Sequence, residues 1–116
     1  MNAKEFARLV ARDGGCLHCG ETEAIAPNHR INRGMGGVGK NSPLNLPSNL
    51  VILCSQLNGL IESDDRWAAF AKRYGYKLER WQNPAEEPVF DFGSGVWKLL
   101  DESFGSSVVP EGMETT

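Results

Sequence analysis

Residues 16–62 read CLHCGETEAIAPNHRINRGMGGVGKNSPLNLPSNLVILCSQLNGLIE, and we expect the rest of the chain to be arranged around this segment. It contains a Cys-x-x-Cys pair, Cys16 and Cys19, followed by His29 in a basic segment rich in glycine. A third cysteine, Cys54, stands one helical turn before an asparagine. Because a plain apolar core does not need this combination, we expect something other than apolar packing to hold the segment together.

Length and charge limit the classes of function. The chain has 116 residues and a formal net charge of −3 at pH 7. This length suits one small domain, which a structural metal would help because a small core buries a limited share of its surface. The negative charge argues against a general polyanion binder, since non-specific nucleic-acid affinity comes mainly from neutralised phosphates.

The charges are unevenly distributed along the chain. Arg30, Arg33 and Lys40 stand in a segment without acids, whereas seven acids and a single lysine follow position 85. A nucleic-acid contact would therefore fall on the first part of the chain. A further basic group, which either contacts phosphates or is only solvated, comprises Arg66, Lys72, Arg73, Lys77 and Arg80.

Cysteine number and hydropathy indicate the compartment. Three cysteines are an odd number, and the chain starts without a positive segment followed by an apolar run, so a secreted disulfide framework is not expected. We expect a reducing, cytoplasmic environment. No apolar run approaches the roughly 20 residues that span a bilayer, so no membrane contact is expected.

The spacing of Cys16 and Cys19 lets both thiolates reach one ion, and Gly20 allows a tight turn after the second thiolate. A thioredoxin-like redox pair would need a long helix directly after it, whereas residues 21–27 read as a turn and a short strand. We favour zinc, and a redox pair or buried unligated cysteines stay open. His18 is expected to point to solvent, or to act as a fourth ligand if the loop is distorted.

Hydrophobic spacing divides the rest of the chain into elements. Helices are expected at residues 2–12 and 66–74, a short strand at 24–31, and a hairpin with a Gly-rich turn at 88–100. The run 50–53 is too short to distinguish a strand from the start of a buried helix.

From Cys54 onward the pattern is helical. It places Asn58 and Glu62 on one helical face, where two oxygen donors can hold a hard cation or can simply be solvated.

The predicted fold class is α+β, in a single domain of residues 1–104. Residues 16–62 form its site core and residues 88–100 its C-terminal hairpin. Residues 105–116 are expected to be a disordered acidic tail. The glycine-rich segment before Lys40 lacks the hydroxyl residue that completes a P-loop, so nucleotide binding is not expected.

Several short pieces, taken in their order, resemble the HNH endonuclease family, and especially the small HNH proteins of phages of actinobacteria. The pieces are Cys16-x-x-Cys19, Asn28-His29-Arg30, Arg33-Gly34-Met35-Gly36-Gly37, Asn49-Leu-x-x-Leu-Cys54 and Asn58-x-x-x-Glu62. The resemblance extends to about Gly105. It implies a ββα-metal (His-Me finger) core, in which two short strands and a helix hold one divalent cation, with a Cys-x-x-Cys knuckle and flanking helices.

The resemblance implies roles for single residues. His29 corresponds to the general base that takes a proton from the attacking water. Asn49 corresponds to the asparagine that orients this histidine, and Asn58 to the third position of the motif. Asn58 and Glu62 would hold Mg²⁺ or Mn²⁺, with Asn28 at a position where the family usually has an Asp or His ligand.

Further roles concern DNA and zinc. Arg30, Arg33 and Lys40 would contact DNA phosphates. A structural zinc ion would be held by Cys16, Cys19 and Cys54. In many family members a second Cys-x-x-Cys supplies four thiolates, whereas Leu57 stands three residues after Cys54 in this chain.

The expected activity is that of a metal-dependent DNA endonuclease that nicks or cleaves phosphodiester bonds, in the host cytoplasm if the chain is phage-encoded. Two alternatives stay open. One is a nucleic-acid-binding module whose metal site has decayed. The other is a phage accessory factor that binds a packaging or host protein through its acidic end and through Trp81 and Trp97.

Overall fold

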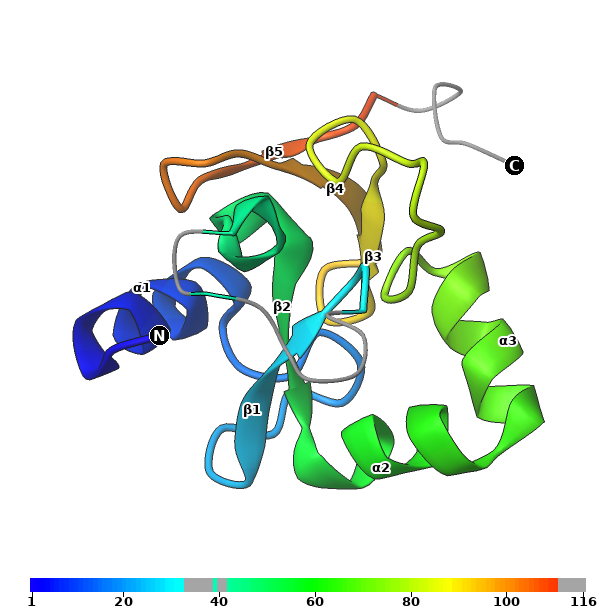
Figure 1. Ribbon diagram of the computed structural model, residues 1–116. Coiled ribbons are helices and arrows are strands. Elements are labelled where there is room, and N and C mark those ends of the chain that lie inside the picture. Colours follow the sequence, from blue (N-terminus) through cyan, green and yellow to red (C-terminus); the bar gives the residue numbers. More distant parts are fainter. Residues whose placement is uncertain (33–38, 40–41, 111–116) are drawn as a thin grey trace.

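The computed structural model describes residues 1–32, 39 and 42–110. Within these residues the chain forms three α-helices and two antiparallel sheets, so the predicted α+β class is confirmed (Figure 1). In chain order the elements are α1 (Ala3–Asp13), β1 (Ile25–His29), the 3-10 turns η1 (Pro43–Asn45) and η2 (Pro47–Asn49), β2 (Leu50–Cys54), α2 (Ser55–Ser63), α3 (Asp65–Arg73), β3 (Val89–Asp91), β4 (Val96–Leu100) and β5 (Ser106–Val108).

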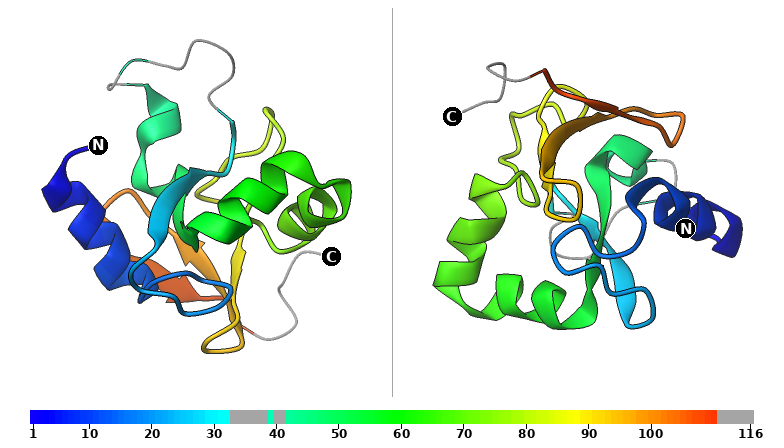
Figure 2. Two further views of the ribbon diagram at one scale, coloured as in Figure 1. Left: turned by 90° about the horizontal axis from the view of Figure 1, so that it is seen from below. Right: turned by 180° about the vertical axis from the view of Figure 1, so that it is seen from behind.

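The apolar run after Asn49 is a strand, β2, and both of its faces are buried. Alternate residues of a strand point to opposite faces, so a strand covered on both sides reads as a continuous apolar run. Leu50 and Ile52 pack with α1, whereas Val51 and Leu53 belong to the larger core with α2 and α3. In Figure 2, α1 and α3 accordingly lie on opposite sides of β2.

Strands β1 and β2 pair antiparallel, with Ile25 opposite Cys54 and His29 opposite Leu50. Helix α2 follows β2 without an intervening residue. The chain therefore forms a β-β-α unit, in which β1 ends at His29 and α2 begins beside the third cysteine.

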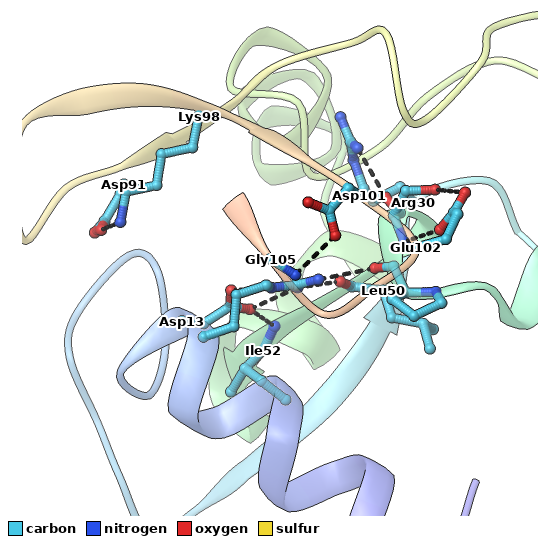
Figure 3. A network of polar contacts seen from close by, with 12 residues as sticks. Asp13, Arg30, Leu50, Ile52, Asp91, Lys98, Asp101, Glu102 and Gly105 are labelled. Atoms are coloured by element: carbon cyan, nitrogen blue, oxygen red, sulfur yellow. Dashed lines mark hydrogen bonds and ion pairs between the residues drawn. The ribbon is translucent and has the colours of Figure 1, made fainter. Parts of the chain in front are cut away.

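Two polar side chains fix α1 against this unit. Arg12 and Asp13 form a buried ion pair with Nε and Oδ1 2.7 Å apart. Arg12 also donates to the carbonyl oxygens of Pro47 and Leu50, and Asp13 accepts the N–H of Ile52 at 2.9 Å (Figure 3). The end of α1 is thus hydrogen-bonded to the main chain on both sides of Asn49.

The C-terminal hairpin is part of a three-stranded sheet, in which β4 pairs with both β3 and β5. The expectation of a disordered tail from residue 105 onward is wrong for residues 106–108, which form β5. Asp101 accepts hydrogen bonds from the N–H groups of Ser103 and Gly105 and closes the turn that returns the chain along β4 (Figure 3). Residues 111–116 lie outside the described residues.

Arg30, directly after β1, is fully buried. Its three guanidinium nitrogens donate to the main-chain carbonyl oxygens of Ser48, Gly75, Pro84, Glu87 and Pro88. Burial lowers the pKa of Arg30 to about 9, so the group stays charged at neutral pH. The prediction that Arg30 contacts DNA phosphates is therefore wrong, because its donors are used inside the protein.

Gly75 is one of the residues whose carbonyl oxygen accepts a hydrogen bond from Arg30. Its φ of 84° is in the left-handed region, and a Cβ at this position would collide with the carbonyl oxygen of Pro88. The close approach lets the carbonyls of Gly75 and Pro88 both reach one guanidinium. No helix among the described residues is long and apolar enough to cross a membrane.

Replacement of Arg30 by Met should lower the free energy of unfolding by about 3 kcal/mol or more, since buried carbonyls lose their donors. Urea unfolding followed by circular dichroism measures this change. The matched control is Arg80→Met, at an exposed arginine, which should change stability by less than about 0.5 kcal/mol. Equal stabilities of the two variants would contradict the role given to Arg30.

Candidate functional site

The sulfur atoms of Cys16, Cys19 and Cys54 all lie within 4.8 Å of one another. Cys16 and Cys19 come from the loop after α1, and Cys54 comes from the junction of β2 and α2, so the β1–β2 pairing brings them together. All three are free thiols. Among the residues described, this is the one group of three or more His, Cys, Asp or Glu side chains placed to share a metal ion.

Main-chain N–H groups point at each of these sulfurs. The N–H of Leu57 lies 3.3 Å from the Cys54 sulfur and caps α2. The N–H of Glu21 lowers the pKa of the Cys19 thiol. Burial raises the pKa of the Cys16 thiol, although the N–H groups of residues 18, 19 and 54 oppose this. Such donors stabilise thiolates, which are the ligands that zinc prefers.

His18 does not join the three cysteines. Its ring is half-buried and stands edge-on to Trp67, Phe70 and Phe92, with ring centroids 6.0, 5.3 and 5.2 Å away. The expectation that His18 points to solvent is therefore wrong. The apolar side of α3, visible in the spacing of Trp67 and Phe70, was the only sequence signal for this packing.

His29 ends β1 and is half-buried. Its Nε2 lies 3.0 Å from the amide oxygen of Asn45. Asn45 in turn donates from its amide nitrogen to the carbonyl of Gly39 at 2.9 Å, which leaves the amide oxygen to face the imidazole. The amide of Asn45 therefore holds one ring nitrogen of His29.

Asn49 is buried and binds the chain just beyond His29. Its amide oxygen accepts the N–H of Ile31 at 2.8 Å, and its amide nitrogen donates to the carbonyl of Ile31 at 3.2 Å and to that of Leu44 at 2.8 Å. The carbonyl of Asn49 accepts the N–H of Arg30 at 2.8 Å. Asn49 therefore fixes the main chain after His29.

Lys77 connects His29 with Glu62, and no sequence motif indicated this contact. Its Nζ donates to the carbonyl of His29 at 2.9 Å and to the amide oxygen of Asn32 at 2.7 Å, and it lies 3.4 Å from a Glu62 carboxylate oxygen. The Lys77 side chain is 10% exposed and that of Glu62 is 66% exposed. Burial lowers the pKa of Lys77, and Glu62 opposes this shift.

The two remaining predicted ligands both bind main-chain carbonyls through their amide nitrogens. Asn28 is buried and donates to Tyr76 at 2.8 Å, whereas Asn58 is half-buried and donates to Leu53 at 3.4 Å. Their amide oxygens keep the chemistry of cation ligands. A divalent cation at Asn28, Asn58 and Glu62 stays a prediction.

The structure gives three different outcomes for the other residues that were predicted to contact a partner. Arg33 and Lys40 lie outside the described residues. Lys72 pairs with Glu79 at 3.2 Å, so its charge is partly neutralised. Trp81 is 82% exposed, as predicted, but Trp97 is half-buried and stacked on Tyr74, which corrects its expected exposure.

Comparisons with protein-family models, with curated proteins and with solved structures gave no match. The interpretation of this site therefore depends on the residues and their geometry.

We expect the protein to bind one zinc ion and to lose thermal stability when a chelator removes it, because the ion joins the loop after α1 to the start of α2. Zinc content and the melting temperature with and without chelator measure this. Cys54→Ser is the sharpest variant, since serine keeps a cap for α2 while the thiolate is lost. It should bind zinc at least about tenfold more weakly. Equal zinc content in both proteins would contradict the ligand assignment.

Proposed function

We propose that this protein is a DNA endonuclease of the HNH type, which hydrolyses phosphodiester bonds with Mg²⁺ or Mn²⁺ as cofactor. The observation that carries the proposal is the place of His29 in the β-β-α unit. His29 ends β1 opposite the start of β2, and its carbonyl shares the Lys77 ammonium with Glu62 at the end of α2. One histidine base and one carboxylate thereby lie on the same edge of the unit.

His29 acts as the general base in this proposal. In this role the imidazole takes a proton from water as the water attacks phosphorus, while the amide of Asn45 contacts its Nε2. Asn45 is a positioning residue, because its amide holds the imidazole through one hydrogen bond.

The main chain on both sides of the imidazole is fixed. Lys77 binds the carbonyl of His29 itself, and Asn49 binds both polar groups of Ile31. A base whose main chain cannot shift keeps its distance to a bound phosphate, and this reduces the reorganisation needed in the transition state. Lys77 and Asn49 are therefore positioning residues as well.

The oxygen donors of Glu62, Asn58 and Asn28 suit a hard divalent cation. Such a cation, when bound, neutralises charge on the phosphate and on the departing oxygen. Lys77 competes for Glu62 with its own positive charge, 3.4 Å from the carboxylate. Cation binding at Glu62 therefore has to overcome this ion pair.

The His29→Ala variant should lose at least about 100-fold in the rate of nicking supercoiled plasmid, because general-base catalysis typically contributes that much. The assay compares EDTA, Mg²⁺ and Mn²⁺. His18→Phe is the matched control, since it removes the other histidine and keeps an aromatic ring against α3. His29→Ala protein that nicks at the unchanged rate would rule out this base.

The Lys77→Met variant should bind Mn²⁺ about fivefold more tightly, because a positive charge near an exposed carboxylate is removed. Calorimetric titration measures the affinity. Lys72→Met is the control, because its ammonium pairs with Glu79 instead. Identical Mn²⁺ affinities for the two variants would show that Glu62 is not a ligand.

The second candidate function is that of a nucleic-acid-binding module without catalysis. The ion pair of Lys77 with Glu62 favours it. The ammonium already balances the charge of Glu62, so this carboxylate does not need a metal ion as its charged partner. This candidate predicts DNA retardation that weakens as salt rises, with no cleavage product in Mg²⁺ or Mn²⁺.

A further inference from the structure

The cluster of Cys16, Cys19 and Cys54 offers three ligands to an ion that takes four. We propose that a metal ion bound there keeps one exchangeable coordination position, which takes a nitrogen or sulfur donor from outside this chain. The inference depends on the zinc prediction and is independent of the nuclease proposal.

The residues that neighbour the cluster in sequence are engaged elsewhere. His18 packs its ring among three aromatic side chains of α3 and the hairpin. A carboxylate oxygen of Glu21 accepts the N–H groups of Thr22 and Glu23, each at 2.9 Å. Leu57 stands three residues after Cys54, where a second Cys-x-x-Cys motif would have its second cysteine. It is an apolar residue in the buried core. The described part of the chain thus places no fourth ligand beside the three sulfurs.

The cluster is accessible from one side. Cys16 is buried and Cys54 half-buried, whereas Cys19 is exposed at the tip of its loop. A donor from solvent would therefore approach past Cys19, and the core behind Cys16 closes the opposite side. This arrangement is that of a metal site with three protein ligands and one open position.

The chemistry of the site selects the class of donor. Three thiolates make a soft ligand set, and closed zinc sites of this kind are completed by a fourth thiolate or by an imidazole. A hard oxygen anion would be a poor fourth ligand, because soft ligand sets favour sulfur and imidazole donors. The donor can come from a small molecule or from a cysteine or histidine of another protein molecule, including a second copy of this chain.

The test uses the 116-residue chain loaded with Co²⁺, whose visible absorption depends on the ligands and their number. Imidazole and a small monothiol are added in separate titrations. We expect each to change the wild-type spectrum until saturation. Leu57→Cys should bind Co²⁺ at least about tenfold more tightly and should not respond, because its own thiolate fills the fourth position. Leu57→Ala is the matched control, which loses the same packing without gaining a ligand, and it should respond like the wild type.

The dependence of the spectrum on protein concentration distinguishes a donor from a second copy of this chain from a small-molecule donor. A spectrum that changes as the protein is concentrated, without added ligand, supports a donor from a second copy. A spectrum that is constant with concentration but responds to the monothiol supports a small molecule.

A wild-type spectrum that is insensitive to both added ligands and to concentration would overturn the inference. Failure of the wild type to bind Co²⁺ would overturn it together with the zinc prediction. The nuclease proposal would be unaffected by either result, because the plasmid assay decides it separately.

Discussion

The guanidinium of Arg30 is the interaction on which the rest of the structure depends. It joins the turn before β2, the turn after α3 and the segment before β3 through main-chain carbonyls alone. A buried charge is tolerated only when its donors are satisfied, so these three segments have to close around it together. Because Arg30 directly follows His29, the same closure sets where the end of β1 lies relative to the rest of the molecule.

The cysteines act at the opposite end of the β-β-α unit. Cys54 pairs in register with Ile25 at the start of β1, whereas His29 pairs with Leu50 at its end. The unit is thus held by a thiol cluster at one end and by buried polar contacts at the other. Both ends of its two short strands are therefore held by residues distant in sequence.

Local signals predicted the parts of this fold that have local causes. Caps and apolar spacing gave α1 and α3 to within about a residue, and turn residues gave the C-terminal hairpin. The sequence left the structure of residues 50–53 undecided, because the run is short and burial of both faces removes the alternation that marks a strand. The burial of Arg30 and the contacts of Lys77 could not be predicted, since their partners lie up to 58 and 48 residues away. In the candidate site, the cysteine cluster was foreseen from the Cys-x-x-Cys spacing together with the resemblance, whereas the ammonium beside Glu62 was not.

The sulfur of Cys54 has two roles in this structure, as a member of the thiol cluster and as the acceptor that begins α2. A reaction at that one atom, whether oxidation or alkylation, would change both the cluster and the first turn of a nine-residue helix. The same helix carries Asn58 and Glu62. A change at the Cys54 sulfur that unwinds this first turn would therefore also shorten the helix that positions Asn58 and Glu62.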